Sequence, residues 1–107
     1  MIQLNIKPLS VNESYTGRRF KTDKYKNLEK AVLFMLPKIT LPEPPYKLYF
    51  EFGVSNAIAD LDNPCKSIQD ILSKKYGFND RLIYELNIKK VITEKGKEFI
   101  RFKIEHL

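Results

Sequence analysis

The segment YKLYFEFGV, residues 46–54, sets the fold class expected for this chain. Its apolar side chains alternate with more polar ones, Leu48, Phe50 and Phe52 against Tyr49 and Glu51. This is the period of a strand that buries one face, and β-branched and aromatic residues favour strands. The proline-rich connector LPEPPY runs into the start of the strand and separates it from the preceding part of the chain.

A helix is expected before this strand. Thr22 or Asp23 is suited to cap its start, and Pro37 stops it after Leu36. Apolar residues recur near helical spacing within it, namely Leu28, Val32, Met35 and Leu36.

A second helix is expected after the strand, and both of its ends are marked. Asn63 is a good N-cap, and Pro64 suits the first helical position because its missing N–H would be unpaired there anyway. Gly77 is placed to close the far end. The stripe expected to be buried is Cys65, Ile68, Ile71, Leu72 and Tyr76, which assigns the cysteine to packing rather than to reactivity.

Three further strands complete the pattern. Residues 2–6 alternate until Pro8, residues 82–91 alternate again, and residues 99–104 follow a glycine-containing turn. The last two strands are expected to pair as an antiparallel hairpin. The order β-α-β-α-β-β predicts an α+β fold, a small single domain over residues 1–107 whose mixed β-sheet has two helices packed on one face.

The composition suits a soluble globular protein with an acidic partner. Of 107 residues, 43% are hydrophobic and 30% are charged, which is too apolar for a disordered chain. The longest apolar run, residues 31–36, is too short for a membrane span, and no signal peptide is evident, so we expect a cytoplasmic protein with no membrane partner. The net charge of +6 favours nucleic acid or an anionic surface as partner.

Cys65 and His106 are the only cysteine and histidine. A lone cysteine makes neither an internal disulfide nor a cysteine zinc cluster. A histidine within the last three residues is expected to be solvated or packed rather than catalytic. Chemistry that needs a histidine or cysteine base or nucleophile is therefore disfavoured.

Aspartate is concentrated at the start of the second helix and just beyond its end. Four of the five aspartates lie between positions 60 and 80. Asp60 and Asp62 leave the same side of an extended chain, so holding both ionised calls for a cation, and Mg²⁺ favours carboxylate oxygens. Asp80 is able to supply a third carboxylate if the next strand returns alongside. The alternative is a capping cluster that favours the helix N-terminus electrostatically. An EF-hand is excluded, because Cys65 stands at the glycine position of its loop.

Lys66 lies four residues before Asp70, in the first turn of the expected helix. This spacing favours a surface ion pair that stabilises the helix by about 0.3 kcal/mol. The functional alternative is that its ammonium group holds a phosphate oxygen or stabilises charge that develops in a transition state.

Residues 8–22 are expected to form a loop, with a short hairpin around Thr16-Gly17. Basic residues lie there beside Tyr15 and Phe20. A loop of this kind is suited to contact backbone phosphates and to pack an aromatic ring on an unstacked base. The alternative is a solvated basic surface. The residues assigned to DNA contact are Asn12, Arg18, Arg19 and Lys21.

The segment DLDNPCKSIQDIL, residues 60–72, followed by GFND and LIYEL, resembles the RusA family of Holliday junction resolvases (crossover junction endodeoxyribonucleases). Spacing and residue type agree with the family's Asp-x-Asp-Asn-x-x-Lys-x-x-x-Asp-x-Leu signature at six positions. The stretch Pro8-x-Ser10-x-Asn12 is similar to the family's opening motif, so the resemblance spans nearly the whole chain.

The resemblance implies a catalytic set of Asp60, Asp62, Lys66 and Asp80, in which the three aspartates bind Mg²⁺ and Lys66 is the catalytic lysine. Asp70 matches a later helical aspartate that is expected to partner Lys66. The implied activity is that of a Mg²⁺-dependent endodeoxyribonuclease of DNA recombination and repair. It would be a homodimer that nicks two strands of a four-way DNA junction symmetrically.

The family's acidic pair is Asn79-Asp80 in this chain, so one carboxylate is replaced by an amide. This departure favours an alternative, a branched-DNA binding protein of the same fold with weak or no cleavage. A third reading is an interaction domain without catalysis whose aspartates cap a helix.

Overall fold

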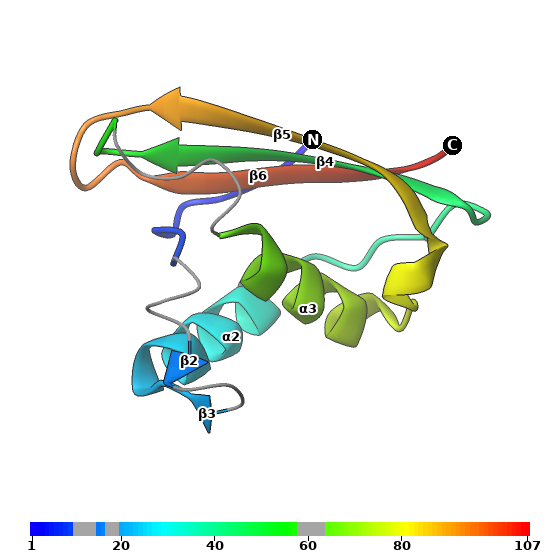
Figure 1. Ribbon diagram of the computed structural model, residues 1–107, viewed down its shortest axis with the longest axis horizontal. Coiled ribbons are helices and arrows are strands. Elements are labelled where there is room, and N and C mark those ends of the chain that lie inside the picture. Colours follow the sequence, from blue (N-terminus) through cyan, green and yellow to red (C-terminus); the bar gives the residue numbers. More distant parts are fainter. Residues whose placement is uncertain (10–14, 17–19, 58–63) are drawn as a thin grey trace.

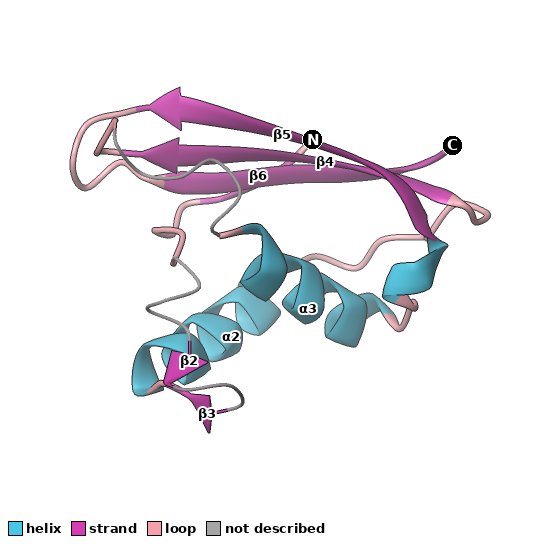
Figure 2. Cartoon of the chain, viewed as in Figure 1, coloured by secondary structure: helices cyan, strands magenta, loops and turns pink. Residues whose placement is uncertain are grey.

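The computed structural model describes residues 1–9, 15–16, 20–57 and 64–107, with only the backbone described at residues 15, 16 and 20. Its described elements are β1 (Ile2–Leu4), β2 (Tyr15–Thr16), β3 (Phe20–Lys21), α2 (Asp23–Met35), β4 (Tyr46–Val54), α3 (Cys65–Tyr76), the short 3₁₀ helix η1 (Asp80–Leu82), β5 (Ile83–Ile92) and β6 (Phe99–His106). Both long helices lie on one face of a four-stranded mixed sheet (Figure 1, Figure 2), which confirms the α+β fold. No described element covers the other face.

The strand order in the sheet is β1-β6-β4-β5. β4 is parallel to β5 and antiparallel to β6, and it lies between them. The expected hairpin of the last two strands is therefore wrong. The helix α3 carries the chain back to the starting end of β4, so β5 must run parallel to it. The connection after β5 then passes the end of β4, where Thr93 N–H donates to the Val54 carbonyl (2.9 Å), and β6 pairs along the opposite edge of β4.

The core lies between the sheet and the two helices. Leu48, Phe50 and Phe52 point from β4 into it, as their alternation predicts. Their cross-strand partners in β6 include Phe102 and Ile100, which are also buried. Burying side chains of this kind stabilises the fold by roughly 1.5–3 kcal/mol each.

The start and the end of α2 are close to the predicted ones. Thr22 caps the helix, and its Oγ1 accepts a hydrogen bond from the Tyr25 N–H (3.2 Å). Tyr25 is buried although the apolar pattern omitted it, whereas Met35 is exposed. The ring of a tyrosine supplies a large apolar area that favours burial.

The ends of α3 are set by Pro64 and Gly77. Gly77 adopts the left-handed conformation (φ 72°), which a residue without a Cβ adopts at little cost, and it closes the helix as predicted. The expected cap Asn63 lies outside the described residues. Cys65 is buried, in agreement with its assignment to packing, and Ser67 is buried beside the predicted stripe.

The short hairpin predicted around Thr16-Gly17 is confirmed by its two strands, β2 and β3, which pair antiparallel. Among the described residues, every helix is too short or too polar to span a membrane.

Candidate functional site

The α3 N-terminus carries the first of the predicted site residues. Lys66 Nζ lies 3.2 Å from Asp70 Oδ1, one turn further along the helix. The lysine side chain is 63% exposed and the aspartate side chain 31% exposed. The local i,i+4 ion pair predicted from the sequence is thus formed, and it holds the ammonium group on the surface at the start of α3.

Asp60 and Asp62 lie outside the described residues. The chain on either side of them is described, however. Before them, the Ala57 carbonyl accepts a hydrogen bond from Lys90 Nζ (2.8 Å) beyond the end of β4. After them, Pro64 leads directly into α3.

Asp80 is the predicted site residue with the most unusual environment. It begins η1, which Asn79 caps by accepting a hydrogen bond from the Arg81 N–H (3.0 Å). One carboxylate oxygen of Asp80, Oδ1, is buried and has no hydrogen-bond partner within the described structure. A buried carboxylate oxygen without a partner is costly unless a cation satisfies it. A hard divalent ion such as Mg²⁺ suits this donor.

The described structure does not bring Lys66 and Asp80 together. Lys66 lies in the first turn of α3, whereas Asp80 follows its last turn (Figure 1). The helix between Lys66 and Tyr76 is about 15 Å long, at 1.5 Å per residue. Because Ile83 pairs with Tyr46, η1 lies at the start of β4, and Ala57 lies beyond its end. No group of three or more metal-ligating side chains occurs among the described residues.

Lys21 is the predicted DNA-contact residue whose side chain is described. Its ammonium lies 3.5 Å from Glu29 Oε2 and 4.9 Å from the ring centroid of Tyr25. Lys74 of α3 contacts the other oxygen of Glu29 at 3.0 Å. Lys21 is therefore tied to α2 at the base of the hairpin, with a side chain still 42% exposed. Asn12, Arg18 and Arg19 lie outside the described residues.

The Glu29 carboxylate links the β2–β3 hairpin, α2 and α3. Desolvation raises the pKa of this carboxyl, but hydrogen bonds and charge attraction from Lys74 and Lys21 lower it by more. The net result is a pKa below the ordinary glutamate value, so Glu29 is ionised at neutral pH and holds both lysines.

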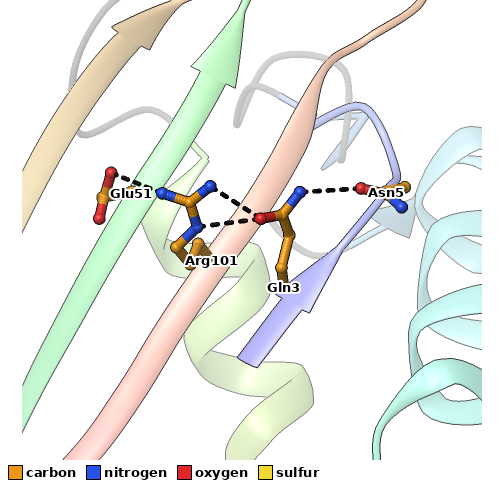
Figure 3. Close-up of polar contacts among 4 residues, drawn as sticks. All are labelled: Gln3, Asn5, Glu51 and Arg101. Carbon is orange, nitrogen blue, oxygen red and sulfur yellow. Dashed lines mark hydrogen bonds and ion pairs between the residues drawn. The ribbon is translucent and has the colours of Figure 1, made fainter. Parts of the chain in front are cut away.

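A polar network crosses three strands on the open face of the sheet (Figure 3). Arg101 of β6 donates from Nη1 to Glu51 Oε1 (3.2 Å), and from Nε and Nη2 to Gln3 Oε1 (3.1 and 2.7 Å). Gln3 in turn donates to Asn5 Oδ1 (3.0 Å). The guanidinium is already engaged by protein groups, so this network ties β1, β6 and β4 together rather than offering a site for a phosphate.

Sequence reasoning missed this network. Its signal was a carboxylate within an apolar strand, since Glu51 stands between Phe50 and Phe52 and is only 7% exposed. Two aromatic rings lie beside this network on the same face of the sheet. Phe99 lies under Arg101 (4.7 Å to the centroid) and Tyr49 under Lys103 (5.6 Å). Desolvation and the nearby Glu51 raise the pKa of Tyr49.

A scan of the chain against protein-family models gives no match, and a search among curated proteins gives none either.

Proposed function

We propose that this protein is a Mg²⁺-dependent, structure-selective endodeoxyribonuclease that resolves four-way (Holliday) DNA junctions by paired symmetric nicks. The proposal begins from the RusA-like pattern of residues 60–72 and 77–80. The structural observation that carries it is the buried, unpartnered Oδ1 of Asp80, as judged within the described residues. A carboxylate that costs stability when unoccupied is typical of a cation site.

In this proposal Asp60, Asp62 and Asp80 hold Mg²⁺, and Lys66 is the catalytic lysine. When bound, Mg²⁺ supplies Lewis-acid polarisation of the scissile phosphate and lowers the pKa of water. The exposed ammonium of Lys66 offsets negative charge that develops on the phosphate in the transition state. None of these steps needs a histidine. The chain's single histidine, His106, lies near the C-terminus, where the Glu43 carbonyl accepts a hydrogen bond from its Nδ1 (2.7 Å).

The net charge of +6 supports a nucleic-acid partner. In the proposal Asn12, Arg18, Arg19 and Lys21 contact the DNA backbone around the branch point. Lys21 reaches that role by exchanging part of its contact with Glu29 for a phosphate, because its side chain remains substantially exposed. The protein acts as a homodimer, since a four-way junction presents two equivalent strands to be cut.

The separation of Lys66 and Asp80 constrains the proposal. A single ion can bind both Asp80 and a site at the start of α3 only if Asp80 of one copy lies beside the start of α3 in a second copy. A homodimer with the right geometry meets this condition.

A second candidate is a branched-DNA binding protein of the same fold with weak or no cleavage. Asn79 favours it, because the side-chain oxygen that replaces the family's carboxylate already caps η1 through the Arg81 N–H. An oxygen used in this way is a weaker ligand than a second carboxylate would be.

The experiment is a cleavage assay on a four-way junction beside a linear duplex of the same sequence, with Mg²⁺ or with chelator. We expect paired nicks in the junction alone, dependent on Mg²⁺, and lost in Asp62→Asn. Asp23→Asn is the matched control, since Asp23 lies in the first turn of α2 and belongs to no proposed site. Tight junction binding without cleavage would support the second candidate. If calorimetry finds neither junction binding nor Mg²⁺ uptake, the aspartates serve only to cap the helix.

A further inference from the structure

Glu29 holds two ammonium groups, one on each of its carboxylate oxygens. Oε2 lies 3.5 Å from Lys21 Nζ at the base of the hairpin, and Oε1 lies 3.0 Å from Lys74 Nζ of α3. The Glu29 side chain is only 17% exposed, whereas the side chains of Lys21 and Lys74 are 42% and 60% exposed. The two lysines are therefore accessible to an outside ligand, while the carboxylate between them is largely enclosed.

The surface around this cluster is basic. Lys26, one helical turn before Glu29, and Lys30, the residue after it, are exposed, as is Lys75 of α3. None of these three lysines forms an ion pair with another residue in the described part of the chain. Glu29 is the only acid of α2 beyond its first turn. Its single negative charge is thus what weakens the attraction of this surface for an anion.

A carboxylate and a DNA phosphodiester bind a pair of lysines in the same way. Each carries one negative charge and has two free oxygens that accept hydrogen bonds. An ammonium group has three donors, and Lys74 uses one of them on Glu29 Oε1. Because the pKa of Glu29 is lowered, its carboxyl stays ionised at neutral pH. The lysines are therefore released from it only when another anion competes for them.

We propose that Glu29 is an intramolecular competitor of DNA, which in the free protein occupies the place between Lys21 and Lys74 that a phosphate of duplex DNA takes in the complex. Phosphates recur along a duplex, so the flanking lysines are able to contact the neighbouring ones. The competition lowers the affinity for any duplex. Weakly held linear DNA is then released, while a more tightly held junction stays bound. The inference rests on the proposed function for its nucleic-acid partner.

Binding of a linear duplex in chelator tests this competition. Glu29→Gln frees both lysines, so it should tighten binding about fivefold at low salt and steepen the log–log salt dependence by up to about one unit. Glu43→Gln is the matched control, because it makes the same charge change at an exposed glutamate of the connector before β4. It should tighten binding by less than about twofold.

Two further variants separate competition from net charge. Glu29→Asp keeps the charge but shortens the side chain by one methylene, which draws the carboxylate away from both ammonium groups, so it should give part of the gain. Lys74→Met in the Glu29→Gln background removes one of the freed lysines and should cancel most of the gain. Thermal unfolding checks that each variant is folded. If Glu29→Gln fails to fold, Glu29→Asp carries the test.

Linear-duplex binding that is undetectable, or that is unchanged or weaker in Glu29→Gln and Glu29→Asp, overturns the inference. Glu29 then only holds the hairpin and the two helices together. An equal gain in Glu43→Gln also overturns it, since net charge then explains the effect. So does a gain on phosphatidylserine vesicles that is absent on DNA.

These measurements use neither Mg²⁺ nor a junction, so they are independent of the cleavage assay. A Glu29→Gln gain in a protein that cuts no junction keeps the competition and removes the nuclease. Junction cleavage by a protein in which Glu29→Gln gives no gain does the reverse.

Discussion

The carboxylate of Glu51 and the guanidinium of Arg101 meet on the open face of the sheet, with Oε1 and Nη1 3.2 Å apart. The two residues lie directly opposite each other in β4 and β6. The Glu51 side chain is only 10% exposed, so it has lost most of its hydration, and Arg101 compensates for that loss.

Arg101→Met should therefore destabilise the protein by about 2–3 kcal/mol, because it leaves a buried carboxylate without its charged partner. The measurement is the free energy of unfolding in urea. In the double variant Glu51→Leu with Arg101→Met, no charge is left buried, and most of the loss should be recovered. A double variant that is less stable than the single one would contradict this account.

Gly53 of β4 lies beneath the ring of Phe99, its cross-strand partner in β6. An ideal Cβ at position 53 would overlap that ring. Gly53→Ala should displace Phe99 from its contact with Arg101 and cost about 1–3 kcal/mol. The control is Gly53→Ala in a Phe99→Ala background, where the methyl group has room. We expect the glycine substitution to cost clearly less there, as measured by thermal unfolding.

The sequence predicted the elements better than it predicted their neighbours. β4 has the predicted bounds, and α2 and α3 are capped by Thr22 and Gly77, because alternation and capping are local properties. The pairing of β5 and β6 was wrong because alternation shows which face of a strand is buried but not which strand lies beside it. That was decided by the α3 crossover, which leaves β4 between them.

In the candidate site, too, local contacts were predictable from the sequence and long-range positions were not. The contact between Lys66 and Asp70 was predictable from a spacing of four residues on one helix. The position of Asp80 in the fold was not predictable in this way, because it depends on the end of the sheet at which β5 begins. The burial of Glu51 was missed because its partner Arg101 is 50 residues away in sequence.

Glu29 gives the protein a pH dependence. Desolvation raises the pKa of its carboxyl, but Lys74 and Lys21 lower that pKa by a larger amount. The net result is a pKa below the ordinary value of 4.5. A carboxyl whose folded pKa is lowered stabilises the fold above its unfolded pKa. That contribution is lost as the pH falls through the folded pKa.

Glu29→Gln should thus lower the melting temperature at about pH 7 and have a smaller effect at about pH 3, where the wild-type carboxyl is protonated too. The pairs are partly exposed, so the loss at neutral pH should stay below about 1 kcal/mol. Glu43→Gln, at an exposed glutamate of the connector before β4, is the matched control. A Glu29→Gln effect that is equal at both pH values would show that packing, not charge, is responsible.

The DNA-contact proposal for the β2–β3 loop predicts a change in salt dependence. Arg18→Ala and Arg19→Ala should each flatten the log–log dependence of junction binding on salt by up to about one unit, because each removes one phosphate contact. The measurement is a binding titration over a series of salt concentrations. Lys38→Ala, an exposed basic residue after α2, is the control and should leave the slope unchanged. An unchanged slope in both arginine variants would mean that this basic loop is only solvated surface.

Asp80 should cost the protein stability in the absence of a divalent ion. Its Oδ1 is buried without a hydrogen-bond partner in the described structure, so Asp80→Asn removes the negative charge that this unsatisfied oxygen shares. We expect the variant to melt at the same temperature as the wild type or higher in chelator. In Mg²⁺ the wild type should gain stability by mass action and the variant should not, which reverses their order. Asp70→Asn is the control, because its carboxylate is occupied by Lys66 and should give no difference between the two buffers. If Asp80→Asn instead loses stability equally in chelator and in Mg²⁺, Asp80 serves to hold η1 in place, and the metal-site proposal loses its structural support.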